Sequence, residues 1–170
     1  RQLLAPTRAL GEQVYEALHA AFPKEPFLLK LSRIYRDARR LHGNGPYKDH
    51  LWFCVRAGGE DWTGRPTFYF EIGPDYYSYG MGFWAPKAAL MEAYRKAVDE
   101  HPEVLEKLVK RFNKQAQFTL SGPEYARKKT APSPLLAAWY NKKSINLQHD
   151  AAPDERMFSQ ELAQDIIEGF

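Results

Sequence analysis

A group of charged and polar residues between positions 36 and 50 is the strongest candidate for a binding site. The group consists of Arg36, Asp37, Arg39, Tyr47, Lys48 and His50. An arginine offers phosphate or carboxylate a planar fork of donors, whereas a lysine offers a compact positive charge. Asp37 could orient one of the arginines, and Tyr47 could donate a hydrogen bond. These residue types predict a site for a small anionic ligand, with or without a reaction.

The same residues also have a structural interpretation. Residues 26–35 alternate apolar and polar side chains as a half-buried strand does. Gly43-Asn44-Gly45-Pro46 then reverses the chain, because glycine allows positive φ and proline fixes its own φ. Arg33 falls on the apolar side of the strand, which predicts a buried guanidinium paired with Asp37, the nearest carboxylate. On this interpretation the arginines tie a turn to a sheet.

Hydrophobic periodicity predicts an α+β fold. Four strands with short connections are expected at residues 27–35, 50–56, 67–72 and 76–83. Helices are expected at residues 6–21, 86–100 and 102–112, and a last one is expected after Ser159, which can cap it. Consecutive strands with short connections favour an antiparallel meander. We therefore expect a four-stranded antiparallel meander sheet with helices packed on one face.

Two glycines distinguish the fourth expected strand. Gly80 and Gly82 leave one of its faces without side chains, so another group can approach the backbone closely. A packed helix is slightly favoured over a ligand as that group. Residues 115–154 follow with little periodicity, which predicts a long loop with one helical turn.

The motifs of the chain resemble those of a known family. Arg36-Asp37-x-Arg39 and Pro46-Tyr47-Lys48 occur at the spacing of the signature R-D-T-R-F-S-K-D-K-T-P-Y-K of the domain of unknown function 2461. The resemblance extends to Gly80-Met81-Gly82-Phe83-Trp84-Ala85-Pro86, to Arg95 and to Lys143-Ser144. It implies a shared fold and a site that includes Gly82, Trp84 and Arg95, and it implies no reaction.

The chain also departs from this family pattern. Arg40 stands where the family usually has an aromatic residue, and Gly43 and Asn44 stand where it usually has Asp and Lys. No role of that acid and base is transferred to this chain. Family members usually have an aromatic, asparagine-containing segment before the position of Arg1, which predicts a truncated N-terminus.

The length and composition of the chain limit the kind of protein that it can be. A chain of 170 residues, 44% hydrophobic and 26% charged, suits a single globular domain over residues 1–170. The single cysteine, Cys54, excludes an internal disulfide and fits a reducing compartment, so we expect a cytoplasmic protein. No apolar run reaches the ~20 residues that span a bilayer, so no membrane partner is expected.

The sequence lacks the motifs of several common phosphate-binding and metal-binding sites. The phosphate-binding motifs GxxxxGK[ST] and GxGxxG do not occur, and neither does the zinc motif HExxH. The five histidines are scattered, and Cys54 lies too far along its strand from His50 for contact. We expect no metal and no cofactor.

Two alternatives to a small anionic ligand remain. The net charge of +3 is modest, but a nucleic-acid-binding module could combine the arginines with Trp52 and Tyr69 for stacking and with Lys128, Lys129, Lys142 and Lys143 for phosphates. The other alternative is a protein-interaction domain in which the arginines are structural. The sequence indicates neither the ligand nor an oligomeric state.

Overall fold

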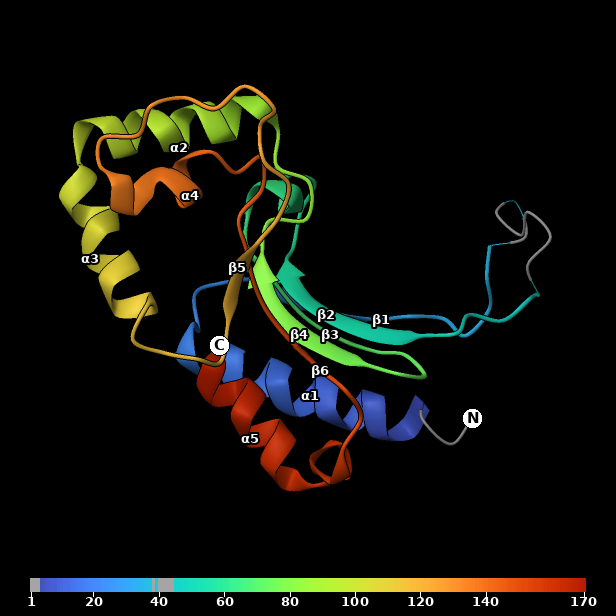
Figure 1. Ribbon diagram of the computed structural model, residues 1–170. Coiled ribbons are helices and arrows are strands. Elements are labelled where there is room, and N and C mark those ends of the chain that lie inside the picture. The colour runs from blue at the N-terminus through green and yellow to red at the C-terminus, as the bar shows by residue number, and fades with distance from the viewer. Residues whose placement is uncertain (1–3, 38, 40–44) are drawn as a thin grey trace.

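A six-stranded antiparallel sheet dominates the computed structural model, which describes residues 4–37, 39 and 45–170 (Figure 1). The strands are β1 (Phe27–Leu31), β2 (Leu51–Ala57), β3 (Thr67–Ile72), β4 (Tyr77–Gly82), β5 (Thr119–Ser121) and β6 (Asn146–Ala151). Their spatial order is β1-β2-β3-β4-β6-β5. The α-helices are α1 (Leu4–Ala21), α2 (Ala88–Glu100), α3 (Pro102–Phe112), α4 (Ala137–Tyr140) and α5 (Gln160–Gly169). Short 3-10 helices are η2 (Trp62–Gly64), η3 (Pro134–Leu136) and η4 (Glu155–Phe158).

The predicted α+β fold and the antiparallel meander of β1 to β4 are confirmed, but the prediction of four strands is wrong. The two additional strands come from the segment that was expected to be a loop. β5 is only three residues long, and the side chains of β6 are almost all half-buried. Neither strand therefore alternates between buried and exposed positions, which is the pattern that reveals a strand in a sequence.

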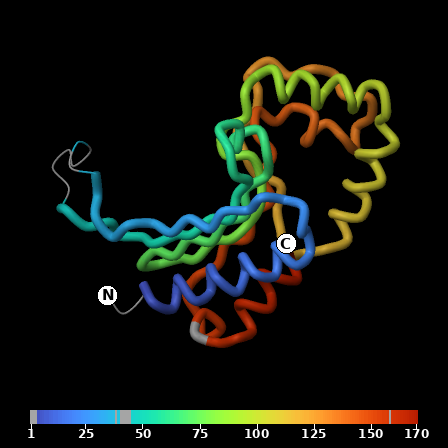
Figure 2. Tube along the Cα trace, turned by 180° about the vertical axis from the view of Figure 1, so that it is seen from behind, coloured from blue at the N-terminus to red at the C-terminus, as the bar shows by residue number. Residues whose placement is uncertain are grey.

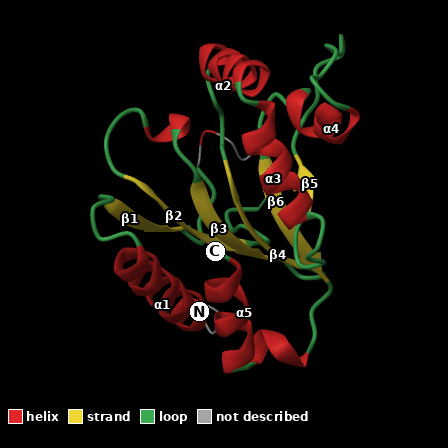
Figure 3. Ribbon diagram, turned by 90° about the vertical axis from the view of Figure 1, so that its left-hand side faces the viewer, coloured by secondary structure: helices red, strands yellow, loops and turns green. Residues whose placement is uncertain are grey.

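Helices α1 and α5 cover one face of the sheet (Figures 1 and 3). The core between them consists of inward-facing strand residues and one stripe of each helix, among them Val14, Leu18, Phe53, Val55, Phe68, Phe70, Tyr77, Tyr79, Leu162 and Ile166. Phe53 and Phe70 stack at a centroid distance of 5.6 Å. Burial of these aromatic and aliphatic side chains is the main source of stability of the sheet.

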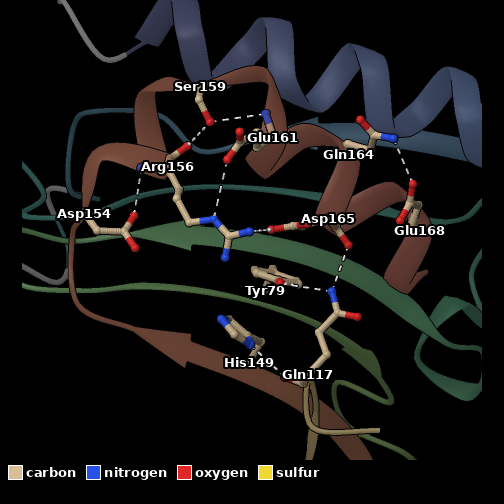
Figure 4. Close-up of polar contacts among 10 residues, drawn as sticks. All are labelled: Tyr79, Gln117, His149, Asp154, Arg156, Ser159, Glu161, Gln164, Asp165 and Glu168. Carbon is tan, nitrogen blue, oxygen red and sulfur yellow. Dashed lines mark hydrogen bonds and ion pairs between the residues drawn. The ribbon is translucent and has the colours of Figure 1, made fainter.

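Ser159 begins α5, as the sequence predicted. Its hydroxyl accepts a hydrogen bond from the backbone N–H of Glu161, in the first turn (Figure 4). Arg156, just before the helix, pairs with Asp165 at 3.1 Å and lies 3.8 Å from the Glu161 carboxylate. These contacts fix the entry of the chain into α5.

Gln117 joins α5 to the sheet. Its side-chain amide donates to the hydroxyl of Tyr79 and to the backbone carbonyl of Asp165 (Figure 4). The ring of His149 donates from Nδ1 to the Gln117 carbonyl at 2.7 Å and stacks on Tyr79 at 4.6 Å. A small polar network therefore closes the edge of the aromatic core.

The remaining helices form a separate lobe. Helices α2, α3 and α4 with η3 enclose a second core of Val98, Val109, Leu136 and Tyr140. The predicted pair of helices interrupted at Pro102 is confirmed, since His101 ends α2 and Pro102 begins α3. Figure 1 shows this lobe beyond one end of the sheet, so the prediction of helices on one face holds for α1 and α5 only.

The glycines of β4 allow a close approach of β6 and of Ile145 just before it, not of a helix. A Cβ at Gly80 would lie 2.1 Å from the backbone oxygen of Leu147, and a Cβ at Gly82 would lie 2.5 Å from that of Ile145. The favoured expectation of a packed helix is therefore wrong. In a flat sheet a Cβ points out of the sheet and away from the neighbouring strand. Because a Cβ at Gly80 would overlap β6, β6 must bend over the face of the sheet that α1 and α5 leave uncovered. We call this face the open face.

Residues 32–37 and 45–50, which we call the arm, extend β1 and β2 away from the rest of the molecule (Figure 2). The arm is irregular: only Tyr35 and Tyr47 form a β-bridge within it. In the described parts of the chain, no helix combines the length and apolarity needed to cross a membrane.

Candidate functional site

The arm carries most of the residues that the sequence singled out. Two backbone hydrogen bonds hold its two sides together, from Arg36 N–H to the Pro46 carbonyl and from Lys48 N–H to the Ile34 carbonyl, both at 2.8 Å. The exposed rings of Tyr35 and Tyr47 pack on each other at 5.4 Å. The local fold is therefore a narrow hairpin whose side chains lie mostly in solvent.

Arg36 bonds to the other side of the hairpin. Its Nε donates to the backbone oxygen of Tyr47 at 2.7 Å, and its Nη2 lies 3.4 Å from Asp49 Oδ1. The same Asp49 oxygen is 2.8 Å from Nδ1 of His50. The hydrogen bond with His50 is the main reason why the pKa of Asp49 is below its usual value, and the charge of Arg36 lowers it further.

Arg39 is also engaged within the arm. It forms a two-pronged contact with Asp37, with Nε to Oδ1 at 3.0 Å and Nη2 to Oδ2 at 2.8 Å. Its side chain is 88% exposed, so the pair is a surface ion pair. Arg33 is exposed as well. The prediction that Arg33 is buried is wrong, because β1 ends at Leu31 and the alternation of faces is not maintained beyond it.

The predicted site residues do not converge on one place. Tyr47, Lys48 and His50 line a hollow of about 690 Å³ beside the arm, whereas Gly82 and Trp84 line a separate groove on the open face. Arg95 lies in α2 and is only 6% exposed.

Arg95 makes an unusual contact for a buried cation. Its guanidinium lies 4.8 Å from the ring centre of Tyr125, and its Nη1 has no hydrogen-bond partner. None of the arginine ion pairs among the described residues includes it, so this buried guanidinium has no carboxylate partner among them. A cation–π contact of this kind stabilises by roughly 1 kcal/mol.

We expect Arg36→Lys to destabilise the protein modestly, because lysine cannot bond to the Tyr47 carbonyl and to Asp49 in the geometry of the fork. A loss of about 1 kcal/mol would lower the melting temperature by roughly 2 to 4 °C in a chain of this size. Arg39→Lys is the matched control and should leave the melting temperature unchanged. Thermal melts that show equal values for both variants would contradict a structural role of Arg36.

The open face holds a groove with a volume of about 660 Å³. Strand register sets its floor as three rows that run across β2, β3, β4 and β6. The first row contains Arg56, Thr67, Gly82 and Asn146; the second contains Cys54, Tyr69, Gly80 and Gln148; the third contains Trp52, Glu71, Ser78 and Asp150. Trp62, Phe83 and Trp84 line the groove from outside these strands. We call this site the open-face groove.

The first row contains polar groups without partners. The guanidinium of Arg56 lies over Trp62, 4.4 Å from the ring centre. Its Nη1 makes only a long 3.4 Å contact with the Ala57 carbonyl, and its Nε has no partner among the described residues. Thr67, opposite Arg56 in the register, is 7% exposed, and its hydroxyl has no partner either. None of the arginine ion pairs in the described ranges includes Arg56.

The middle of the floor is less charged. The hydroxyl of Tyr69 shares a hydrogen bond of 3.3 Å with Ser78. Burial raises the pKa of the Cys54 thiol, which makes this cysteine a slow nucleophile at neutral pH. Lys30, on the edge strand β1, is the neighbour of Cys54 in the register.

The third row is acidic. Glu71 accepts a hydrogen bond from the hydroxyl of Tyr76, and this bond is the main cause that raises the pKa of Tyr76 to about 12. Asp150 accepts two hydrogen bonds from the side-chain amide of Gln148, at 2.7 and 2.8 Å. The groove therefore has Arg56 at one end, Lys30 beside its middle row and two carboxylates at the other end.

Sequence reasoning missed Arg56, Trp62, Thr67, Glu71 and Asp150 as site residues. Part of the signal was present, because Trp52, Cys54 and Arg56 alternate with the apolar residues of β2 and must share its opposite face. Nothing in the sequence showed that this face is uncovered. In the part of the chain that the structure describes, no three His, Cys, Asp or Glu residues are grouped to hold a metal ion.

Comparisons with known proteins agree with the motifs. A search of curated proteins finds no significant match. A family model with the description "Conserved hypothetical protein (DUF2461)" matches residues 1–170. Because this match covers the whole chain, the protein belongs to the DUF2461 family.

Proposed function

We propose that the protein binds a small anionic organic ligand in the open-face groove, with Arg56 as the anion-binding residue. The observation that carries this proposal is that two neighbours in the first row lack partners among the described residues: Arg56 has no carboxylate, and the buried Thr67 hydroxyl has no hydrogen-bond partner. Buried polar groups are normally satisfied by protein or water. Such groups in a groove are expected where a ligand completes the hydrogen bonding.

The dimensions and walls of the groove support a small organic molecule. Its volume of about 660 Å³ lies in the range of small-molecule sites. Arg56 makes a cation–π contact with Trp62, which restrains its guanidinium before a ligand arrives. Trp84 is 76% exposed at the edge of the groove, where a large aromatic side chain can cover an apolar or aromatic part of a ligand.

The arm supplies the border of this site. Lys48 Nζ lies 5.6 Å from the ring centre of Trp52, which lines the groove. Arg36 and Arg39 already bond to Tyr47 and Asp37 within the arm, and binding an anion there would compete with those contacts. We therefore propose Arg56, and not the arm, as the residue that binds the anionic ligand suggested by the sequence, and we propose no reaction.

Cys54 provides a direct test, because it is the only cysteine of the chain and lies on the groove floor. We expect iodoacetamide to alkylate it more slowly than free cysteine at neutral pH and faster as the pH rises, because burial raises the pKa of the thiol. The aromatic anion naphthoate should protect Cys54 from alkylation at lower concentrations than its neutral analogue naphthamide.

Arg56→Met should abolish this preference for the anion. A hydrogen bond to a charged group is worth about 1.5 to 3 kcal/mol, so the naphthoate concentration that protects Cys54 should rise roughly 10- to 100-fold. Arg65→Met is the control, since Arg65 is exposed and pairs with Glu25 outside the groove. The proposal is wrong if naphthoate gives no protection, or if both variants respond alike. Protection by oligonucleotides with a steep salt dependence would instead indicate the nucleic-acid-binding alternative.

A further inference from the structure

The charges of the open-face groove are segregated along the strands. Arg56 and Trp52 stand four residues apart on β2, and Thr67 and Glu71 stand four residues apart on β3. At about 3.3 Å per residue, the first and third rows are roughly 13 Å apart. A ligand that touches both ends must therefore be elongated, and it meets a positive group at one end and negative groups at the other.

The carboxylates at the third row accept hydrogen bonds but form no ion pair among the described residues; Lys48 lies over Trp52 of the same row. Glu71 accepts from Tyr76, and Asp150 accepts from Gln148. Neither carboxylate takes part in any of the ion pairs formed by the described residues. Two strand spacings, or roughly 10 Å, separate their backbones, and Ser78 lies between them in the row.

The two carboxylates act on the same part of the groove. Burial is the largest cause of the raised pKa of Tyr69, and the hydrogen bond with Ser78 opposes it. The negative charges of Asp150 and Glu71 are smaller causes, and both raise this pKa. The Tyr69 hydroxyl therefore stays protonated as a donor between the two ends. The Thr67 hydroxyl at the first row, on which the proposed function rests, has no hydrogen-bond partner among the described residues.

We infer that the ligand is dipolar, with an anionic group at Arg56 and Thr67 and an ammonium group between Glu71 and Asp150. An ammonium group carries three donors and no acceptor, and the acidic end offers two carboxylates that form no ion pair among the described residues. A dianionic ligand would meet repulsion at this end. This inference rests on the proposed binding of an anion at Arg56 and adds the second recognition element.

Three linear probes of equal chain length test the inference: aminooctanoate, octanedioate and diaminooctane. Their charged ends can span a distance close to that between the two rows. Each is titrated against the alkylation of Cys54, with naphthoate as the reference for the Arg56 end. We expect aminooctanoate to protect Cys54 at a concentration at least about tenfold lower than either homobifunctional probe requires, because only aminooctanoate matches both ends.

The double variant Glu71→Gln, Asp150→Asn should lose the preference for aminooctanoate over octanedioate and still bind naphthoate. Asp75→Asn is the matched control, because Asp75 is exposed in the turn between β3 and β4 and does not line the groove. If octanedioate protects as well as aminooctanoate while naphthoate protects normally, the dipolar ligand is refuted and the anion site at Arg56 stands. If naphthoate also fails to protect, the proposed function itself is refuted.

Discussion

Gly80→Ala should cost the protein at least about 3 kcal/mol of stability, an unusually large effect for the addition of one methyl group. The new Cβ would lie 2.1 Å from the Leu147 oxygen and 3.1 Å from the Gln148 Cα. Both obstacles are backbone atoms of β6, so no side-chain rotation relieves the overlap. Either β6 moves away from β4 and loses its ladder, or the sheet flattens. We expect the melting temperature to fall by roughly 6 to 12 °C.

Gly64→Ala is the control for the general effect of replacing a glycine. Its nearest neighbour would be a side-chain atom of Leu90 at 4.0 Å, and its φ is not in the left-handed region. This variant should melt within a degree or two of the parent protein. Equal thermal melts for Gly80→Ala and Gly64→Ala would show that β6 does not approach β4 as closely as described.

Leu136→Ala should destabilise the helical lobe by about 2 to 5 kcal/mol, because the side chain is fully buried and its removal leaves a cavity. Leu136 belongs to the second core with Val98, Val109 and Tyr140, and that core shares no residue with the core of the sheet. The lobe should therefore lose stability before the sheet does. In native-state hydrogen exchange, the amides of α2 and α3 should lose protection while those of β2 and β3 keep theirs.

Phe53→Ala is the counterpart in the sheet. Phe53 is fully buried and stacks on Phe70, and its loss should cost about 3 to 5 kcal/mol. In this variant the amides of β2 and β3 should lose protection together with the rest of the domain. If Leu136→Ala lowers protection in the sheet as much as in the lobe, the two cores unfold as one unit and the lobe has no separate stability.

The sequence predicted those elements whose two faces differ. β2 and β3 bury one face under α1 and α5 and present the other to the groove, so their residues alternate clearly. β6 was missed because its side chains are half-buried on both faces. The glycines of β4 correctly indicated a close approach, but glycine reports only that space is needed and not which element fills it.

The candidate site shows the same limit. The sequence singled out Arg36 either as an anion-binding residue or as a residue that ties the turn to the sheet. Its Nε donates to the backbone oxygen of Tyr47, a partner that has no signature in the sequence. In the sequence, Arg56 does not differ from other polar residues of a half-buried strand. The role proposed for it depends on two absences among the described residues: no carboxylate pairs with its guanidinium, and no helix covers the open face. Such absences are properties of the fold and cannot be read from local patterns.

The position of β6 has a consequence for how the chain folds. Gly82 and Asn146 are paired in the register, yet residues 83–145, which include the whole helical lobe, separate them in the chain. Strands β1 to β4 can pair through local contacts, whereas β6 must close a long loop at an entropic cost before its hydrogen bonds form. The edge of β4 would then stay unpaired during the slowest step, and an unpaired edge promotes association between chains. Refolding yields should therefore decrease as protein concentration rises, even though the native sheet covers that edge.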